Sequence, residues 1–209
     1  MRDFFREIRR YLTPCNLVLV GLTAVMYAVQ RIVDIKSGAD AFTEQFALAW
    51  WRIFENHEYY RLVTHIFLHG DLMHLLGNML VLVYCGSILE RILGGFWYIS
   101  NYLCCGIVAG LASALWNAGG IGGEVIYSYS IGASGAIFAM AGLLLFIVIA
   151  NHGRVAEIST RQMIGFIVLS VYSGVSETGI DNIAHIAGAI FGFISGFFIY
   201  RRGGSTYED

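Results

Sequence analysis

Long apolar runs alternate with short polar segments along this chain of 209 residues. An apolar helix of about 20 residues crosses the hydrocarbon core of a bilayer, and six runs approach or exceed that length. They cover residues 15–33, 64–88, 93–116, 131–151, 162–177 and 182–200. The pattern predicts an all-α, polytopic bundle of six transmembrane helices, forming a single membrane domain over residues 1–209.

Composition agrees with this interpretation, since 57% of the residues are hydrophobic and 13% are charged. A soluble domain carries about a quarter charged residues. The formal net charge of -2 excludes a basic nucleic-acid-binding surface as the main feature of the chain. We therefore predict the lipid bilayer, and no nucleic acid, as its surroundings.

Positive charge predicts the orientation of the helices. If six helices alternate in direction, nine of the thirteen Lys and Arg residues fall on one side of the membrane. They are Arg2, Arg6, Arg9, Arg10, Arg91, Arg154, Arg161, Arg201 and Arg202. An excess of positive charge marks the cytoplasmic side, so both termini are expected there. No organellar transit peptide is evident, and we expect a bacterial plasma membrane.

Two segments outside the apolar runs mix aromatic and charged residues. Residues 1–14 combine phenylalanines with arginines, and the first external loop, 34–61, carries Phe42, Phe46 and Trp50 at roughly helical spacing. Amphipathic segments of this kind lie in the interface of a bilayer. The first is predicted to lie on the cytoplasmic face and the second outside. The sequence leaves open whether the loop is a plain aromatic belt or shapes substrate access.

Three polar residues occur at similar positions on three of the predicted helices. An ionisable side chain inside a membrane helix is costly and usually marks a functional site. Ser134, His185 and His74 each lie sixteen or seventeen residues from the cytoplasmic end of their helix. At ~1.5 Å per residue this is about 24 Å. The three groups are thus predicted to share one layer below the external surface.

These residue types suit nucleophilic hydrolysis. An imidazole acts as general base toward a serine hydroxyl near neutral pH, so we predict Ser134 as nucleophile and His185 as base. His74 and Asn78 lie four residues apart, hence on one helix face. With the Ser134 backbone N–H they are predicted to donate hydrogen bonds to an oxyanion. No carboxylate stands at the depth of His185, which predicts a Ser–His dyad without an aspartate. Asp181, one turn before His185, is predicted to be a loop or helix-cap residue. No cofactor or metal is expected.

Small residues predict how the two helices approach each other. Gly188, Gly192 and Gly196 repeat every four residues in the last run, and Gly135 begins a small face next to Ser134. Such faces allow helix backbones to come close in a membrane. The spacing therefore predicts contact between the helices that carry Ser134 and His185.

The histidines also permit a metal site as an alternative. His65 and His69 lie four residues apart, as His74 and Asn78 do, and histidine is a common zinc ligand. No carboxylate or cysteine clearly shares their face. The metal site is therefore the weaker of the two interpretations.

Three motifs together resemble the rhomboid intramembrane serine proteases, and the likeness covers nearly the whole chain. In chain order they are His69-Gly70-Asp71-Leu72-Met73-His74-Leu75-Leu76-Gly77-Asn78, Gly132-Ala133-Ser134-Gly135, and Ala184-His185-Ile186-Ala187-Gly188 followed by Gly192. The resemblance implies a six-helix rhomboid bundle with Ser134 and His185 as the dyad. It also implies His74, Asn78 and the Ser134 N–H as oxyanion donors. Its substrates would be transmembrane proteins, cut near the external ends of their helices.

The resemblance implies two finer features. Phe138 stands where the family often has a tyrosine that stacks on the catalytic histidine, so the ring is kept and the hydroxyl is lost. The run 162–177 and the loop 174–181 would act with the run 64–88 as a lateral gate for substrate.

Three functions follow from the sequence. A serine endopeptidase that cleaves within the membrane is the favoured one. The second is a catalytically inactive rhomboid-like protein that binds membrane clients, and the third is a small proton or metal transporter using His65, His69 and His74. Neither the substrate nor the oligomeric state is encoded in any pattern we recognise.

Overall fold

The computed structural model describes residues 11–38, 40–119, 123–155, 157–176 and 179–200, and most of them are helical. In chain order the elements are α2 (Pro14–Ser37), α3 (Ala41–Phe46), α4 (Trp50–Phe54), α5 (Arg61–Thr64), η1 (His65–Phe67), α6 (Leu72–Val81), η2 (Leu82–Gly86), α7 (Ser87–Leu93), α8 (Gly95–Asn117), α9 (Ser134–Ala150), β1 (Arg154–Val155), β2 (Ile158–Ser159), α10 (Thr160–Ser176) and α11 (Asn182–Ile199). Most of the predicted interfacial segment 1–14 falls outside the described residues.

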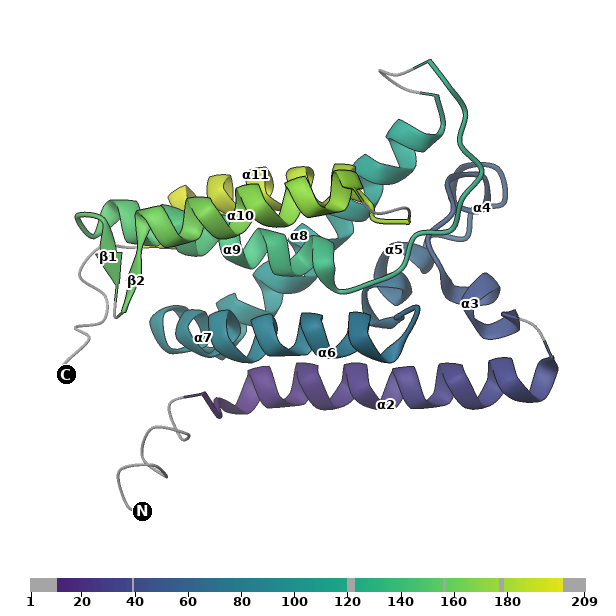
Figure 1. Ribbon diagram of the computed structural model, residues 1–209, viewed down its shortest axis with the longest axis horizontal. Helices are drawn as coiled ribbons and strands as arrows, with labels where there is room; N and C mark the ends of the chain where they lie inside the picture. The colour runs from purple at the N-terminus through teal and green to yellow at the C-terminus, as the bar shows by residue number, and fades with distance from the viewer. Residues whose placement is uncertain (1–10, 39, 120–122, 156, 177–178, 201–209) are drawn as a thin grey trace.

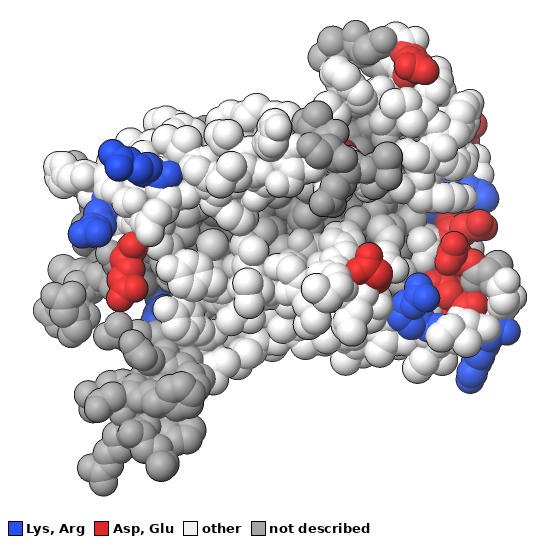
Figure 2. Space-filling model, viewed as in Figure 1, with Lys and Arg blue, Asp and Glu red and all other residues white. Residues whose placement is uncertain are grey.

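Four helical segments within the described part are long and apolar enough to cross a membrane: Pro14–Ser37, Leu72–Leu93, Gly95–Asn117 and Asn182–Ile199. Ser134–Ala150 is apolar but shorter, and α10 has 17 residues. On the face seen in Figure 2, charged side chains gather toward the two ends of the long axis, and the surface between them is nearly uncharged. Such a belt suits lipid. Six crossings and their orientation stay predictions.

The start of the predicted helix 64–88 is wrong. The chain forms α5 and η1, becomes extended at Leu68 (φ -92°, ψ 150°), and starts a new helix at Leu72. Asp71 causes this restart, because its side chain accepts a hydrogen bond from the His74 backbone N–H at 2.8 Å and so caps the new helix. His65 and His69 therefore do not share one helical face, which removes the geometric basis of the metal alternative.

Loop one, the predicted external loop 34–61, forms two short helices, α3 and α4, rather than one amphipathic helix. Between them Ala47, Leu48 and Ala49 are buried, and Leu48 pairs with Ser130 in an antiparallel bridge. The loop is therefore packed into the protein at its middle.

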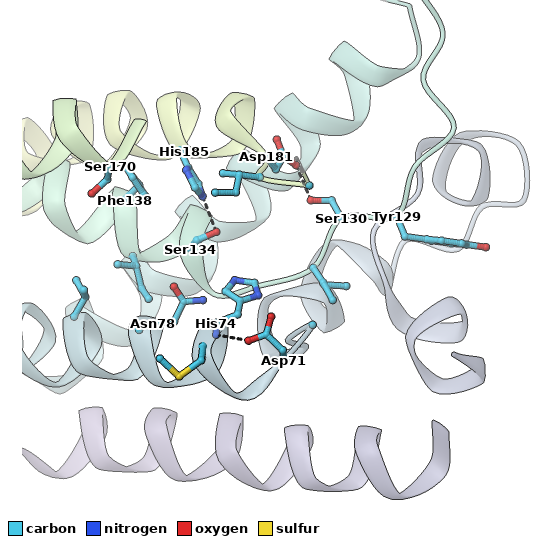
Figure 3. A pocket seen from close by; sticks show the side chains of 18 of the residues that line it. Asp71, His74, Asn78, Tyr129, Ser130, Ser134, Phe138, Ser170, Asp181 and His185 are labelled. Atoms are coloured by element: carbon cyan, nitrogen blue, oxygen red, sulfur yellow. Dashed lines mark hydrogen bonds between the residues drawn. The ribbon is translucent and has the colours of Figure 1, made fainter. Parts of the chain in front are cut away.

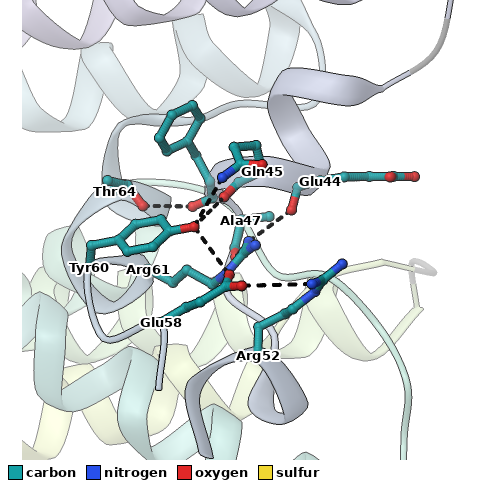
Figure 4. Close-up of polar contacts among 9 residues, drawn as sticks. Glu44, Gln45, Ala47, Arg52, Glu58, Tyr60, Arg61 and Thr64 are labelled. Atoms are coloured by element: carbon teal, nitrogen blue, oxygen red, sulfur yellow. Dashed lines mark hydrogen bonds and ion pairs between the residues drawn. The ribbon is translucent and has the colours of Figure 1, made fainter. Parts of the chain in front are cut away.

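Arg61 holds this loop in place (Figure 4). Its side chain is buried, donates to the carbonyl oxygens of Glu44 and Ala47 at 2.8 and 2.7 Å, and forms an ion pair with Glu58 at 2.6 Å. This hydrogen bond from the guanidinium holds the pKa of Glu58 below its ordinary value. Arg61 thus ties α3 and the segment that follows it to the start of α5.

Helix α9 lies at the centre of the bundle, with α2 and α6 on one side and α10 and α11 on the other (Figure 1). Residues 135–144 of α9 are all buried. Glycines bring α9 and α11 into backbone contact, because a Cβ at Gly188 or Gly192 would overlap a carbonyl oxygen of α9, and one at Gly142 would overlap a carbonyl oxygen of α11. This contact fixes the relative position of the two helices.

Candidate active site

Ser134 and His185 lie at the N-terminal ends of the two helices in closest contact. Ser134 is the first residue of α9, and His185 lies in the first turn of α11. Their side chains point toward each other, with 2.8 Å between His185 Nε2 and Ser134 Oγ (Figure 3). The structure therefore brings together the two residues that the sequence predicted as nucleophile and base.

A phenyl ring, rather than a carboxylate, is the direct neighbour of the His185 imidazole. The Phe138 ring stacks on it at a centroid distance of 4.2 Å and an interplanar angle of 8°. His185 Nδ1 is buried and has no hydrogen-bond partner among the described residues. Packing against Phe138 thus restricts the orientation of the imidazole, a role for which serine hydrolases often use an aspartate.

An open cavity of about 730 Å³ adjoins the Ser134–His185 pair. Its wall comes from α6, from the segment before α9, from α9 itself, from α10 and from the start of α11. Polar and apolar side chains both line it, including Asn78, Ser130, Ile137, Phe166 and Ser170. The cavity offers space for an extended segment of polypeptide beside the serine.

His74 and Asn78 face this cavity from α6 (Figure 3). The His74 ring lies so close to Gly132 that a Cβ at this position would be 3.0 Å from the imidazole. Gly132 also has a φ of +131°, a conformation that favours glycine. The segment before Ser134 can therefore pass close to His74 only with glycine here.

His69 supports Asn78. Its Nε2 atom lies 3.0 Å from Asn78 Nδ2, and its ring packs edge-on against His74 at 4.9 Å. The hydrogen bond uses one of the two N–H groups of the Asn78 amide, which leaves the other for a ligand in the cavity. The motif histidine is thus fully buried behind the two predicted oxyanion donors.

His65 does not join the cavity. It is buried, its Nδ1 atom hydrogen-bonds the Arg61 carbonyl oxygen at 2.8 Å, and its ring packs against Gly110 of α8. Across the described ranges, no group of three His, Cys, Asp or Glu side chains is arranged to hold a metal ion. The residues of the transporter alternative are therefore divided between two places.

Two aspartates at the cavity cap helices, as was predicted for Asp181 and not for Asp71. Asp71 caps α6, and the His74 backbone N–H holds the pKa of this carboxyl below its usual range. Asp181 caps α11 by accepting from the Ala184 backbone N–H at 2.9 Å, and it also accepts hydrogen bonds from Ser113 and Ser130. The cap signals were readable, because an aspartate directly precedes each helix. The serine partners carried no such signal.

Comparison with known proteins agrees with the motifs. The family model described as the rhomboid domain matches residues 56–202. "Rhomboid protease GluP" of Bacillus subtilis is 34% identical over 138 residues, which are 66% of this chain and 25% of that protein. "RHOMBOID-like protein 1" of Arabidopsis thaliana is 34% identical over 152 residues, 72% of this chain and 37% of that protein. "Putative rhomboid protease YdcA" of Bacillus subtilis is 29% identical over 147 residues, 70% of each chain. The chain thus spans a quarter to about a third of the length of the first two relatives.

Proposed function

Because the chain belongs to the rhomboid family, we propose that it is an intramembrane serine endopeptidase that cuts transmembrane helices near their external ends. The family and the apolar helices make it an integral, multi-pass membrane protein. Serine protease activity is the function that the rhomboid protease relatives suggest. The single observation that carries the proposal is the 2.8 Å separation of His185 Nε2 and Ser134 Oγ beside an open cavity.

The proposed reaction begins with proton transfer. His185 Nε2 takes the proton of the Ser134 hydroxyl as Oγ attacks the scissile carbonyl carbon. The tetrahedral intermediate then collapses, its C–N bond breaks, and the leaving amine takes the proton from His185. The resulting acyl-enzyme ester is hydrolysed by water, which His185 deprotonates. The carboxylic acid leaves and Ser134 regains its proton.

The oxyanion formed in each attack needs fixed donors. The Ser134 backbone N–H belongs to the first turn of α9, where no carbonyl of the helix can accept it. The His74 ring and the free N–H of Asn78 face the same cavity. Loss of one such donor typically lowers turnover by about 10²–10³-fold. These three groups are our proposed oxyanion site.

Substrate is proposed to enter sideways, between α6 and α10. Both helices contribute to the cavity wall, α6 through His74 and Asn78 and α10 through Phe166 and Ser170. A helical peptide bond is shielded by its own hydrogen bonds, so the substrate helix must unwind locally before Ser134 reaches the carbonyl. Helix-destabilising and small residues near the cut bond are therefore expected to be preferred.

Cleavage of a reconstituted transmembrane substrate tests the proposal. Ser134→Ala and His185→Ala should each lower cleavage by at least about 10⁴-fold, whereas the exposed loop change Ser128→Ala should not. Undiminished cleavage by both dyad variants would refute the mechanism.

Labelling with a fluorophosphonate separates the protease from an inactive, client-binding rhomboid-like protein. The probe should modify wild-type Ser134 and should leave both Ser134→Ala and His185→Ala unlabelled. A folded wild-type protein that binds membrane clients but never labels would be the inactive protein instead. We propose a bacterial plasma membrane as its location. Since relatives from Bacillus and Arabidopsis are equally similar, fractionation of the source cells must test this.

A further inference from the structure

Asp181 joins three elements that meet at the outer side of the dyad. Its Oδ1 atom accepts from the Ala184 backbone N–H of α11 at 2.9 Å. Its Oδ2 atom accepts from the Ser130 hydroxyl at 2.6 Å and also from the Ser113 hydroxyl of α8. Figure 3 shows Asp181 directed at Ser130, on the strand-like segment that runs into α9.

This segment carries the nucleophile. Ser130 lies four residues before Ser134, and its backbone N–H and C=O both bond Leu48 at 2.9 Å. Two residues later, the Gly132 N–H bonds the carbonyl oxygen of His65 at 3.0 Å. Loop one and η1 therefore hold one edge of the segment, and Asp181 holds the Ser130 side chain on the other.

Asp181 is equally close to the base. It is the N-cap of α11, and its own carbonyl oxygen accepts the His185 backbone N–H at 3.1 Å. One side chain is thus bonded both to the first turn that presents the imidazole and to the segment that presents the hydroxyl. The helix contact through Gly188 and Gly192 begins only below this level.

Comparison with the other aspartate cap shows that capping alone does not need this arrangement. Asp71 caps α6 by accepting from backbone N–H groups of its first turn, chiefly that of His74, and no hydrogen bond from a serine to it is found among the described residues. At Asp181 the second carboxylate oxygen accepts hydrogen bonds from two hydroxyls, those of Ser113 and Ser130. Ser113 is almost fully buried, with 1% of its surface exposed. Hydrogen bonds to a carboxylate are shorter and stronger than neutral ones.

We propose that Asp181 is a positioning residue, which sets the distance between Ser134 and His185 by tying the segment before α9 to the first turn of α11. The proposal rests on the endopeptidase function above. Asp181 lines the cavity, and in this role it acts through the two segments that it joins rather than on the reacting atoms. A displacement of about 1 Å at reacting atoms can lower a rate by about 10²-fold, so loss of the tie should slow chemistry more than binding.

The sharpest variant removes the two donors and keeps the cap. Ser113→Ala/Ser130→Ala leaves the Asp181–Ala184 bond intact, and Ser128→Ala is the matched control, two residues from Ser130 and exposed. We expect kcat for a reconstituted transmembrane substrate to fall about 10–100-fold, with KM within about twofold of wild type. The rate of fluorophosphonate labelling should fall in parallel. Wild-type kcat in the double variant would overturn the proposal.

Two substitutions at Asp181 separate the tie from the cap. Asp181→Ala removes both, and its loss should exceed that of the double serine variant. Asp181→Asn retains a good helix cap, and its amide can still bond both hydroxyls, so it should stay within about fivefold of wild type. In the Asp181→Ala background the two serine changes should have little further effect, because interacting residues are non-additive. Full additivity would contradict the tie.

Hydrogen exchange tests the tie without any activity. In the double serine variant, amides of residues 127–133 and 182–186 should both exchange faster than in wild type, whereas Ser128→Ala should change neither. Wild-type exchange over 127–133 would overturn the proposal even if kcat fell. If the wild-type protein neither cleaved nor labelled, the endopeptidase proposal would fail, and the exchange result would still decide whether Asp181 joins the two segments.

Discussion

Helices α11 and α10 both border the cavity, but they meet the central helix α9 in different ways. Helix α11 contacts α9 through backbone, since Gly188 and Gly192 leave no space for even one added carbon. Helix α10 meets α9 through side chains, including the ring pair Phe138–Phe166 at 6.1 Å. At Gly165 of α10, an added Cβ would meet nothing within 4 Å.

The difference assigns separate tasks to the two sides of the cavity. Backbone contact between helices is close and has few alternative arrangements, which suits the side that holds Ser134 and His185 at hydrogen-bond distance. Contact through side chains, which keeps the two backbones apart, suits a wall that moves to admit a substrate helix. We therefore propose that the α9–α11 contact, which carries Ser134 and His185, is rigid. The α9–α10 contact, beside which the substrate would enter, is proposed to be more mobile.

The strongest test of the comparison adds one methyl group to each side. Gly192→Ala places a Cβ into the Ala139 carbonyl of α9, so the helices must separate, and overpacking of this kind costs about 1–3 kcal/mol. Gly165→Ala is the matched control in α10 and should leave stability unchanged or raise it by up to ~1 kcal/mol, as alanine favours helix. Thermal unfolding in detergent and cleavage rate measure both variants. Equal destabilisation by the two changes would contradict the distinction.

The two phenylalanines at the α9–α10 contact, Phe138 and Phe166, give the next largest difference. Phe138→Ala removes the ring that packs on His185, and we expect kcat to fall about tenfold because the imidazole loses its fixed orientation. Phe138→Tyr keeps the ring and should retain most of the rate. Both variants need a thermal unfolding measurement beside the kinetics, because truncation of a buried phenylalanine also lowers stability.

Phe166→Ala is the corresponding change on the α10 side. This ring lines the cavity and does not stack on His185, so the variant should change KM a few-fold in either direction and leave kcat within about twofold. Fluorophosphonate labelling, which needs no helical substrate, should stay at the wild-type rate. A fall in labelling equal to that of Phe138→Ala would place Phe166 on the rigid side.

Much of this contrast was readable in the sequence. The glycine repeat of residues 188–196 predicted close approach of two helices, and the helix limits agree with the observed ones to within about five residues, apart from the start of the run 64–88. The pairing of Ser134 with His185 followed from their matched distance to the helix ends predicted to be cytoplasmic. These features are local or periodic, so they can be predicted from a single sequence.

The remaining features depend on contacts between distant residues. The apolar stretch Ile66-Phe67-Leu68 concealed the break before α6, although Asp71 is a typical helix cap. The burial of Leu48 follows from its pairing with Ser130, 82 residues later along the chain. The serine partners of Asp181 lie 68 and 51 residues before it. No periodicity relates such positions, so only the folded chain reveals them.

The smallest expected effect concerns loop one, where the Arg61–Glu58 ion pair adds to the backbone hydrogen bonds between Leu48 and Ser130. The hydrogen bond from Arg61 lowers the pKa of Glu58 below its ordinary value. A carboxyl with a lowered folded-state pKa contributes stability that is present above its unfolded pKa, about 4.3. That contribution is lost as the pH falls through the lower, folded-state value.

The tie should therefore be complete at pH 7 and weaken only under acidic conditions below about pH 4.3. Since Trp50 and Trp51 belong to α4 in the same loop, their fluorescence should report the change. Glu58→Gln lacks the titrating group and should show a flat difference curve over this range. The effect should be modest because the carboxyl is partly exposed to solvent. An identical acid transition in both proteins would assign it to another group, whereas a transition confined to wild type would show that loop one, unlike the α9–α11 contact, is held by a bond that protons can break.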